Sequence, residues 1–326
     1  MKKRLKYAAY ILAGIALFSA ILITKDKIAE AANRVYLNET DLTLELGHYR
    51  TLKVRGTNEK VYWKSGNDRA ATVASNGRVT ARGWGSTRIY AYVGNKTLST
   101  KVTIVQMNKK KVTLAENQTT QLALWGSDNS TTWKSSNEKV ATVSDNGLVT
   151  GISTGTATIT ATFKGKKITS EVSVIGLNHE SFVLEYGGRF SSTRANFGTT
   201  KKLAVIGSKD KITWSSSDTS VATVDSKGKV KAKGPGTATI FATVNGQKIA
   251  STVKVLQMNN SQVELKIGQD YSLDVLGTDS DILWRSTNKN VVTVSDDGVM
   301  TAKGKGSAKV IAEVDGRLVR CIVTVK

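Results

Sequence analysis

The sequence predicts an all-β protein made of four small antiparallel sandwiches in a row. The first observation is a repeat, because Trp63, Trp133, Trp214 and Trp284 are each followed by Ser two residues later and by Asn or Asp four residues later. The second is the patterning, since apolar and polar residues alternate over short runs that end at Gly, Asn or Asp. The third is the spacing of 70, 81 and 70 residues between the tryptophans, which is enough for one small domain per repeat.

The N-terminal residues 1–31 predict an export segment. Lys2, Lys3 and Arg4 precede an uncharged, mostly apolar run over 7–24, which is expected to form one hydrophobic helix, and small residues follow at Ala29 and Ala31. Two alternatives stay open: a signal peptide cleaved near Ala31, or an uncleaved N-terminal membrane anchor, because the run approaches the length that spans a bilayer. Both place the chain from about residue 33 outside the cytoplasmic membrane.

The four repeats are expected at residues 36–106, 107–176, 177–257 and 258–326. Each opens with an apolar residue and Asn, as at Met107 and Asn108. The last strand of one repeat runs straight into the next pair without a Gly, Ser or Pro linker. This continuity predicts a semi-rigid rod.

Three strands are expected in the first half of each repeat. An alternating run such as 42–46 is the first, and a short segment at Leu52 or its equivalents is the second. The third carries the tryptophan, whose parity with the residue two before it, Val61 in the first repeat, predicts that both point inward. We therefore assign Trp63, Trp133, Trp214 and Trp284 to the structural core.

Four further strands complete each repeat. A β-branched run ends at a valine such as Val143, and a glycine such as Gly147 then marks a tight turn that needs a positive φ. The next strand closes at a glycine such as Gly155, from which the most regular strand, 156–163, departs before the last strand. Cys321 lies in the inward slot that Thr100, Ser170 and Ser251 occupy elsewhere, so we expect it to be a buried small side chain.

The chain resembles the bacterial immunoglobulin-like domain of group 2. The motif W-x-S-S-N/D, then VATV, G-x-V and G-T-A-T-I carries the resemblance, which covers residues 36–326 in four copies and is fullest in the second and third. It implies immunoglobulin-like sandwiches in a secreted or surface protein, used as a spacer or adhesive array, without shared catalytic residues.

The net charge of +21 predicts an anionic partner. By repeat the charge is +6, +3, +7 and 0, so it fades at the C-terminal copy. An anionic envelope polymer such as a teichoic acid fits this grading. Nucleic acid is disfavoured, because an export segment is present and no nucleic-acid module is recognisable.

Candidate ligand contacts lie where the repeats differ. The third repeat carries an insertion over 187–200, and loops on rigid scaffolds often bind ligands. Trp125 takes an outward slot, where it would offer a sugar-stacking platform or cover a junction, and Trp84 also stands outside the tryptophan strand. The candidate contacts are Arg189, Phe190, Arg194 and Phe197 of the insertion, Trp125, and the basic runs Lys109, Lys110, Lys111, Lys201 and Lys202. Solvated faces and a self-packed loop are the structural alternatives for the runs and the insertion.

Enzymatic motifs and cofactor sites are not expected. The histidines are His48 and His179, in different repeats, so no Ser-His-Asp set or two-His metal site can form within one domain. Gly-x-Gly pairs such as Gly83 and Gly85 precede a strand rather than a helix, which favours a turn over a phosphate loop. Acidic pairs such as Asp296 and Asp297 lack the spacing of a calcium loop.

The sequence thus predicts a non-enzymatic extracytoplasmic rod, secreted or held at the cell surface, that serves as a structural spacer or adhesion module and contacts an anionic envelope polymer. The alternative is a carbohydrate-binding protein that uses the third-repeat loop or the exposed tryptophans. A host or neighbouring-cell surface is a further candidate partner, as is a larger assembly in which the chain is an accessory subunit. Membrane contact is expected only through the N-terminal segment.

Overall fold

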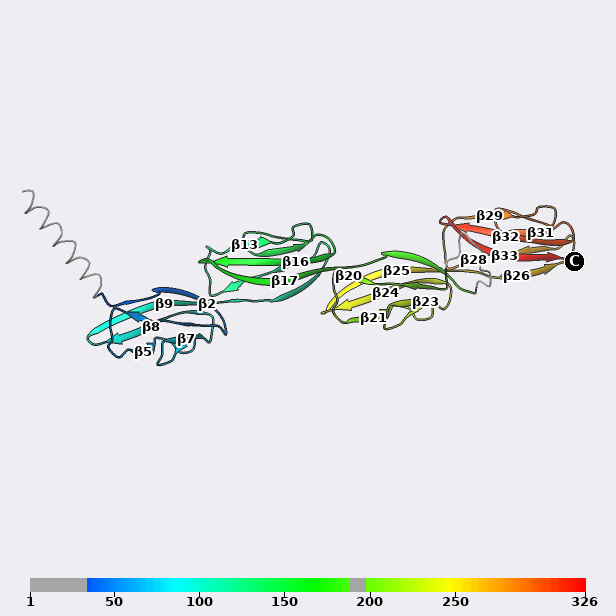
Figure 1. Ribbon diagram of the computed structural model, residues 1–326. Coiled ribbons are helices and arrows are strands. Elements are labelled where there is room, and N and C mark those ends of the chain that lie inside the picture. The colour runs from blue at the N-terminus through cyan, green and yellow to red at the C-terminus, as the bar shows by residue number, and fades with distance from the viewer. Residues whose placement is uncertain (1–33, 188–197) are drawn as a thin grey trace, which may run out of the picture.

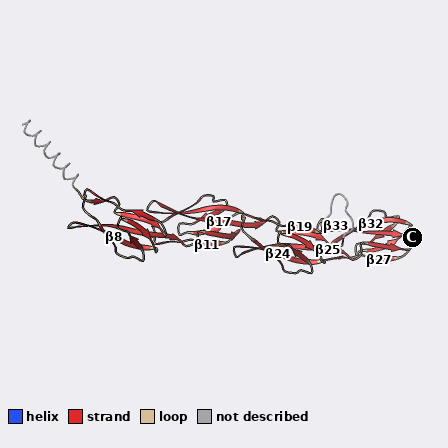
Figure 2. Cartoon of the chain, turned by 60° about the horizontal axis from the view of Figure 1, so that its bottom comes forward, coloured by secondary structure: helices blue, strands red, loops and turns tan. Residues whose placement is uncertain are grey.

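Four β-sandwiches follow one another along a single axis, so the molecule is a rod (Figures 1 and 2). The computed structural model describes residues 34–187 and 198–326, and every regular element in these ranges is a strand. The predicted all-β class and tandem arrangement are confirmed. The predicted export segment and its helix lie outside the described residues. No helix long and apolar enough to cross a membrane occurs in the two described ranges.

The strands are numbered in chain order. The first copy holds β1 (Tyr36–Leu37), β2 (Asp41–Glu45), β3 (Tyr49–Thr51), β4 (Val54–Arg55), β5 (Tyr62–Ser65), β6 (Ala71–Val73), β7 (Arg78–Ala81), β8 (Gly85–Val93) and β9 (Lys96–Met107). The second holds β10 (Lys111–Ala115), β11 (Thr119–Gln121), β12 (Leu124–Trp125), β13 (Thr132–Ser135), β14 (Ala141–Val143), β15 (Leu148–Gly151), β16 (Gly155–Phe163) and β17 (Lys166–Leu177).

The other two copies repeat this order. The third holds β18 (Ser181–Glu185), β19 (Thr200–Lys202), β20 (Val205–Ile206), β21 (Ile212–Ser216), β22 (Ala222–Val224), β23 (Lys229–Ala232), β24 (Gly236–Val244) and β25 (Gln247–Met258). The fourth holds β26 (Gln262–Leu265), β27 (Asp270–Ser272), β28 (Val275–Leu276), β29 (Ile282–Ser286), β30 (Val292–Val294), β31 (Val299–Ala302), β32 (Gly306–Val314) and β33 (Arg317–Val325).

Each copy packs one larger sheet against one of three strands. In the second copy the order is β10-β17-β16-β13 in the larger sheet and β11-β15-β14 in the smaller. All pairs are antiparallel except the first, because β10 runs parallel to β17. The parallel pair differs from the antiparallel expectation. It arises because the first and last of seven alternately directed strands run the same way and become neighbours in one sheet.

The segment expected as the second strand is divided in two. Leu122 lies between β11, which pairs with β15 of its own copy, and β12, which pairs with β9 of the preceding copy. Leu122 itself is fully buried and donates its backbone N–H to Gly147 O at 2.9 Å. The short segment therefore serves two copies at once.

Inward residues of both sheets form the cores. In the second copy Leu114, Ile159 and Val172 are buried together, and Trp133 is only half-buried against this cluster. The same holds for the other three tryptophans, which pack at the margin of their cores. The centre of each core is instead filled by aliphatic side chains. Cys321 is fully buried, as expected, and burial raises the pKa of its thiol to about 12.

The last strand of each of the first three copies crosses into the next copy. The final residues of β9, Gln106 and Met107, pair with β12, and β17 and β25 pair in the same way with β20 and β28. Val105 and Met107 are buried in the core of the second copy. We call β9, β17 and β25 the crossing strands. Because each one belongs to two sandwiches, the junctions have no flexible linker.

Candidate functional site

The junctions between copies are the most elaborate surfaces of the rod. At each one a glycine of the following copy presses on the preceding copy. At the second junction a Cβ on Gly207 would lie 1.9 Å from Val174 O of crossing strand β17 and 3.0 Å from Gly155 N. Gly126 and Gly277 make the same backbone approach at the first and third junctions. Only glycine permits this contact, so the sequence fixes close docking of the copies.

A turn residue of each following copy also reaches back across the junction. Lys164 Nζ lies 2.8 Å from Asp41 Oδ2 at the first junction, and Lys254 Nζ lies 3.0 Å from Asp315 Oδ2 at the third. At the second, Asn245 Nδ2 donates to Thr113 Oγ1 at 3.1 Å. These contacts are exposed, so each contributes only a fraction of a kcal/mol up to about 1 kcal/mol. Their main effect is to orient neighbouring copies, and they add little to stability.

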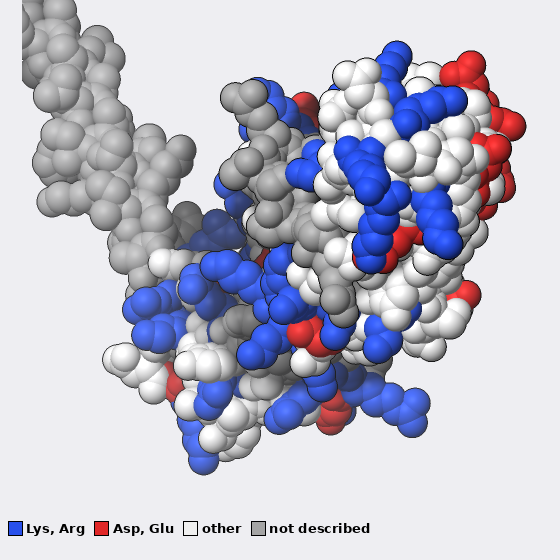
Figure 3. All heavy atoms as spheres, turned by 90° about the vertical axis from the view of Figure 1, so that its right-hand side faces the viewer, with Lys and Arg blue, Asp and Glu red and all other residues white. Residues whose placement is uncertain are grey.

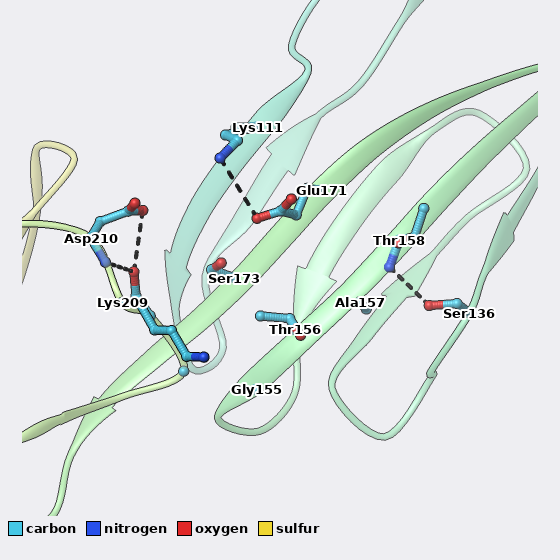
Figure 4. Close-up of a pocket in the computed structure, with 12 residues that line it drawn as sticks. Lys111, Ser136, Gly155, Thr156, Ala157, Thr158, Glu171, Ser173, Lys209 and Asp210 are labelled. Atoms are coloured by element: carbon cyan, nitrogen blue, oxygen red, sulfur yellow. Dashed lines mark hydrogen bonds and ion pairs between the residues drawn. The ribbon is translucent and has the colours of Figure 1, made fainter.

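A polar cleft of about 910 Å³ opens at the second junction (Figure 4). Lys111 and Glu171 line the side formed by the second copy, and their charged groups lie 3.9 Å apart. Lys209 and Asp210 approach from the third copy. A hydrogen bond from Asn245, and a second from Ser208, lower the pKa of Asp210. The cleft also presents hydroxyls from Ser136, Thr156, Thr158, Ser173 and Ser208.

The hydroxyls and charged groups of this cleft suit a polar, hydroxylated ligand. Glu171 lies beside Lys111, and hydrogen bonds from Asn245 and Ser208 favour the ionised form of Asp210, so neither carboxyl is placed as a general acid. No histidine or cysteine lines it. Within residues 34–187 and 198–326 no three His, Cys, Asp or Glu side chains lie close enough to hold a metal ion.

Trp84 and Trp125 meet across the first junction. Their ring centroids are 5.9 Å apart with planes tilted by 39°, and the residues are 57% and 44% exposed. Trp84 precedes β8 in the first copy, and Trp125 ends the short strand β12 of the second. The predicted outward slot of Trp125 is therefore seen, together with a partner that the sequence reasoning did not assign to it. The equivalent pairs at the other junctions, Thr154 with Ile206 and Pro235 with Leu276, are not aromatic.

The predicted basic run at 109–111 is divided among three partners. Lys109 Nζ donates to Thr120 Oγ1 at 2.6 Å, Lys110 lies 3.3 Å from Glu45 of the first copy, and Lys111 faces Glu171. The run therefore contributes to a junction rather than to one cationic patch. Lys109 and Lys110 lie in the bend between β9 and β10, and only Lys111 belongs to a strand, so the three side chains do not share one strand face.

The second predicted run is divided in the same way. Lys202 is exposed and lies opposite Lys229, whereas Lys201 is half-buried and lies opposite Val230. The insertion residues Arg189, Phe190, Arg194 and Phe197 lie outside the described residues.

A set of lysines that stand at alternate positions along and beside β23 was not singled out from the sequence alone. Lys227, Lys229, Lys231 and Lys233 are all exposed and lie along β23 and its ends. The signal was present as K-x-K-x-K-x-K, but it is visible only when charge is counted with the period of a strand face. Viewed from the C-terminal end, Lys and Arg are spread over the visible surface, whereas Asp and Glu gather along one edge of the front copy (Figure 3).

Comparison with known proteins agrees with the four-copy organisation. A family model described as bacterial Ig-like domain (group 2) matches residues 38–104, 100–172, 198–255 and 252–317. The two overlaps between matched ranges, 100–104 and 252–255, fall on the crossing strands β9 and β25.

Two curated proteins are similar over part of their length. Ice-binding protein 1 of Shewanella frigidimarina is 28% identical over 208 residues, which cover 56% of this chain and 23% of that protein. An uncharacterized protein of Clostridium acetobutylicum is 39% identical over 121 residues, which cover 32% of this chain and 12% of that protein. The matched chain spans less than a quarter of either relative.

The comparison with solved structures finds matches at low identity and low TM-score. Invasin, a bacterial integrin-binding protein, is 13% identical with a TM-score of 0.26, over 90% of this chain and 79% of that chain. Domains 1–6 of the surface layer protein SbsC are 16% identical with a TM-score of 0.20, over 92% and 56%.

Proposed function

Because the chain belongs to the bacterial Ig-like domain family of group 2, we propose that it is a non-enzymatic surface or secreted protein, a spacer or adhesive rod outside the cytoplasmic membrane. The family supports the fold and the surface setting. The N-terminal sequence supports export.

The crossing strands carry the proposal. A protein that only needed binding domains could join them with flexible linkers, which let each domain search independently. Here β9, β17 and β25 each run through a junction, and Gly126, Gly207 and Gly277 close it. Such a chain holds its two ends at a fixed separation, which is the property that a spacer requires.

The charge grading supports contact with an anionic envelope polymer. The first three copies carry +6, +3 and +7 and the fourth carries none, so the basic copies are those nearest the predicted membrane side. Many weak contacts along the rod would hold such a polymer, and salt would screen them. The rod would then lie against the envelope through its basic part and present its neutral end outward.

Sedimentation of the full chain with purified bacterial envelope tests this contact. The bound fraction is expected to fall steeply as NaCl rises from low salt to about 0.5 M, where the Debye length is only a few Å. Envelope from which the anionic polymers have been extracted is the control and should retain little protein. Binding that is unchanged by salt, or by the extraction, would contradict an electrostatic contact.

The Trp84–Trp125 pair favours a second candidate, carbohydrate binding. Two exposed indoles at 5.9 Å form an apolar platform of the kind on which sugar rings stack. A glycan array separates the candidates, because discrete hits that Trp125→Ala abolishes would favour this one. Ile206→Ala is the matched control, since Ile206 takes the same outward slot at the second junction and is also 44% exposed. An array without hits, or hits that both variants reduce equally, would exclude the platform.

A further inference from the structure

The outer face of the smaller sheet in the third copy carries a concentrated row of lysines. The face is formed by β19, β23 and β22, with β23 in the centre. Lys229 and Lys231 point outward from β23, while Val230 and Ala232 between and after them are buried in the core. The lysine row consists of Lys202, Lys227, Lys229, Lys231 and Lys233, all of them exposed.

The lysine row is electrostatically unfavourable in the protein alone. Lys202 lies directly opposite Lys229 in the antiparallel ladder, an arrangement of like charges that destabilises a sheet. Lys231 lies between Thr200 and Thr223, which offer hydroxyls but no negative charge. None of the row lysines forms an ion pair with any residue that the structure describes.

One carboxylate, that of Asp225, lies near the row. Its Oδ1 accepts the backbone N–H groups of Lys227 and Lys229, each at 2.8 Å. These bonds fix the turn before β23 and, with the nearby Lys202 and Lys227, lower the pKa of Asp225. A single turn carboxylate cannot neutralise five lysines, so the face keeps a net positive charge.

The fold does not require lysine at these positions. In the second copy the five equivalents are uncharged: Gln121, Asn146, Leu148, Thr150 and Ile152. In the fourth they carry no net charge: Ser272, Asp297, Val299, Thr301 and Lys303. In the first they include two arginines: Thr51, Asn76, Arg78, Thr80 and Arg82. The same backbone thus bears +5 in the third copy and no net charge in its two neighbours, which points to a ligand rather than to folding.

We propose that the lysine row binds a linear polyol-phosphate polymer of the cell envelope, lying along β23. This deepens the proposed envelope contact and rests on it. Alternate residues of a strand are about 6.7 Å apart, so Lys229 and Lys231 of β23 present their charges at that interval. Lys227 and Lys233 extend the row just beyond the two ends of the strand, and Lys202 lies beside Lys229 on β19. Six single bonds separate successive phosphorus atoms in poly(glycerol phosphate), which at roughly 1.2 Å per extended bond gives about 7 Å. Successive phosphates can therefore meet Lys229 and Lys231 in turn, with Lys202 beside the first of them.

The composition of the face selects this chemistry over other polyanions. The forked arginine binds carboxylates and phosphates in oriented two-point contacts, whereas lysine is a compact point charge that makes no such demand on the orientation of the anion. The row holds no arginine, so it suits a flexible polymer whose anionic groups are not held in one plane. No aromatic side chain stands among the lysine row or the threonines that flank Lys231. Single-stranded nucleic acids are normally held by aromatic stacking, so a nucleic acid would find the charge but no platform for its bases.

Binding of the full chain to synthetic poly(glycerol phosphate), measured against salt, tests the proposal. The row variant replaces the five lysines by the residues of the second copy: Lys202→Gln, Lys227→Asn, Lys229→Leu, Lys231→Thr and Lys233→Ile. Affinity at about 50 mM salt is expected to fall at least tenfold, and the slope of log affinity against log salt to decrease by about 3, because up to five phosphate contacts are lost.

A charge-matched control removes the same number of lysines elsewhere. Lys134, Lys139, Lys167, Lys289 and Lys309 are exposed and scattered over two other copies, and their replacement by Gln changes the net charge equally. The affinity of this variant for poly(glycerol phosphate) should fall less than threefold. Transplanting the face to the second copy of the row variant, with Leu148→Lys, Thr150→Lys and Ile152→Lys, should restore part of the lost affinity. The urea midpoint of the row variant should stay at or above that of the wild type, because a like-charge pair is removed.

The outcomes separate the two levels of the proposal. Wild-type protein that does not bind poly(glycerol phosphate) overturns the row, and failure on whole envelope as well overturns the envelope contact. Equal binding by wild type and row variant overturns the row alone, as does an equal loss in the scattered control. Polygalacturonate or a single-stranded oligonucleotide bound as tightly through the row would show that phosphate on a flexible polyol is not what the face selects.

Discussion

The tryptophan of each copy is held by the glycine turn that faces it. Gly147 has a φ of 83°, and a Cβ there would lie 2.6 Å from Leu122 O and 3.0 Å from the indole of Trp133. The same three-way contact recurs with Gly77, Gly228 and Gly298. The W-x-S-x-N/D motif and its following glycine are therefore one packing unit, which explains why they are repeated together.

Gly147→Ala should destabilise the second copy by about 3 kcal/mol, through both a positive φ and a steric overlap. Gly165→Ala is the matched control, since Gly165 has a φ of 75° and open space where the Cβ would lie. It should lose only about 1 kcal/mol. Urea unfolding of the full chain monitored by tryptophan fluorescence measures both, and equal losses would show that the approach to Trp133 is unimportant.

The inward slot on the last strand differs in its chemistry between copies. In the first copy Thr100 Oγ1 donates to Glu39 O at 2.6 Å. Ser170 and Ser251, in the same slot, are buried hydroxyls without a hydrogen-bond partner among the described residues. These two serine hydroxyls are buried without the hydrogen bond that Thr100 makes, which costs stability.

Replacing these serines by alanine should therefore stabilise the protein. Ser170→Ala and Ser251→Ala are each expected to raise the free energy of unfolding by about 1 kcal/mol, because an unsatisfied buried hydroxyl is removed. Thr100→Val, which deletes a made hydrogen bond at nearly constant shape, should lower it by about 1 kcal/mol. Calorimetric midpoints would show the opposite signs, and a loss in the serine variants would mean that their hydroxyls have partners in solution.

At the level of the residue, the sequence predicted which side chains point into the core. It did not predict how deeply each of them is buried. The inward positions of Trp133 and Cys321 followed from alternation along a strand. That the indole lies at the margin of the core depended on how closely the turn at Gly147 approaches it, which is a three-dimensional fact. Likewise nothing in the sequence showed whether the Ser170 hydroxyl could reach a carbonyl.

At the level of the element, the crossing strand is the main organising feature. β17 pairs with β16 over nine residues within its copy and then with β20 over two more in the next. The absence of a linker between Val105 and Met107 predicted continuity. This continuity did not predict that the end of a crossing strand contributes core residues to the following copy. The predicted boundary between two copies fell within a strand that both copies share.

The third junction should loosen in acid. The hydrogen bond from Lys254, and then that from Ser280, lower the pKa of Asp315. A depressed carboxyl pKa means that this contact is fully present above the ordinary Asp value of 3.8 and is lost as pH falls through the lower folded value. Spin labels in the third and fourth copies should report a broader distance distribution only once the pH has fallen below 3.8.

Asp315→Asn is the control for this titration. It should show much of that broadening already at pH 7 and little further change in acid, because the charged contact with Lys254 is absent throughout. A distribution that is independent of pH in the wild type would show that the glycine contact at Gly277 fixes the junction alone.

At the level of the whole molecule, rigidity depends on the junction glycines. Gly207→Ala places a methyl group where 1.9 Å separates it from Val174 O, so the third copy must shift or tilt. Small-angle scattering should show a smaller maximum dimension than for the wild type. Gly268→Ala, at a positive φ with open space around it, should leave the dimension unchanged. An unchanged maximum dimension for Gly207→Ala would mean that the crossing strand β17 alone keeps the second and third copies in line.

The rod and its graded charge could be predicted from the sequence because both are sums over long segments. The surfaces could not. The contiguous lysines at 109–111 lie across the bend that leads into β10 and contact three different partners, whereas the separated Lys229 and Lys231 lie on one strand face. Trp84 and Trp125 lie in different copies and met only because the junction is closed.

The shared strands also impose an order of assembly. In the first copy β1 takes the place of a crossing strand. It pairs with β4 as the end of β9 pairs with β12 in the second copy. Each later copy needs the end of the strand before it, both for hydrogen bonds and for core side chains such as Met107. A chain that emerges N-terminus first therefore completes one copy and offers its free strand end as the template for the next. Assembly therefore proceeds from the N-terminal copy to the C-terminal copy. Loss of a crossing strand prevents folding of the two copies that share it. Truncation of the chain after a crossing strand leaves all the copies before the truncation folded.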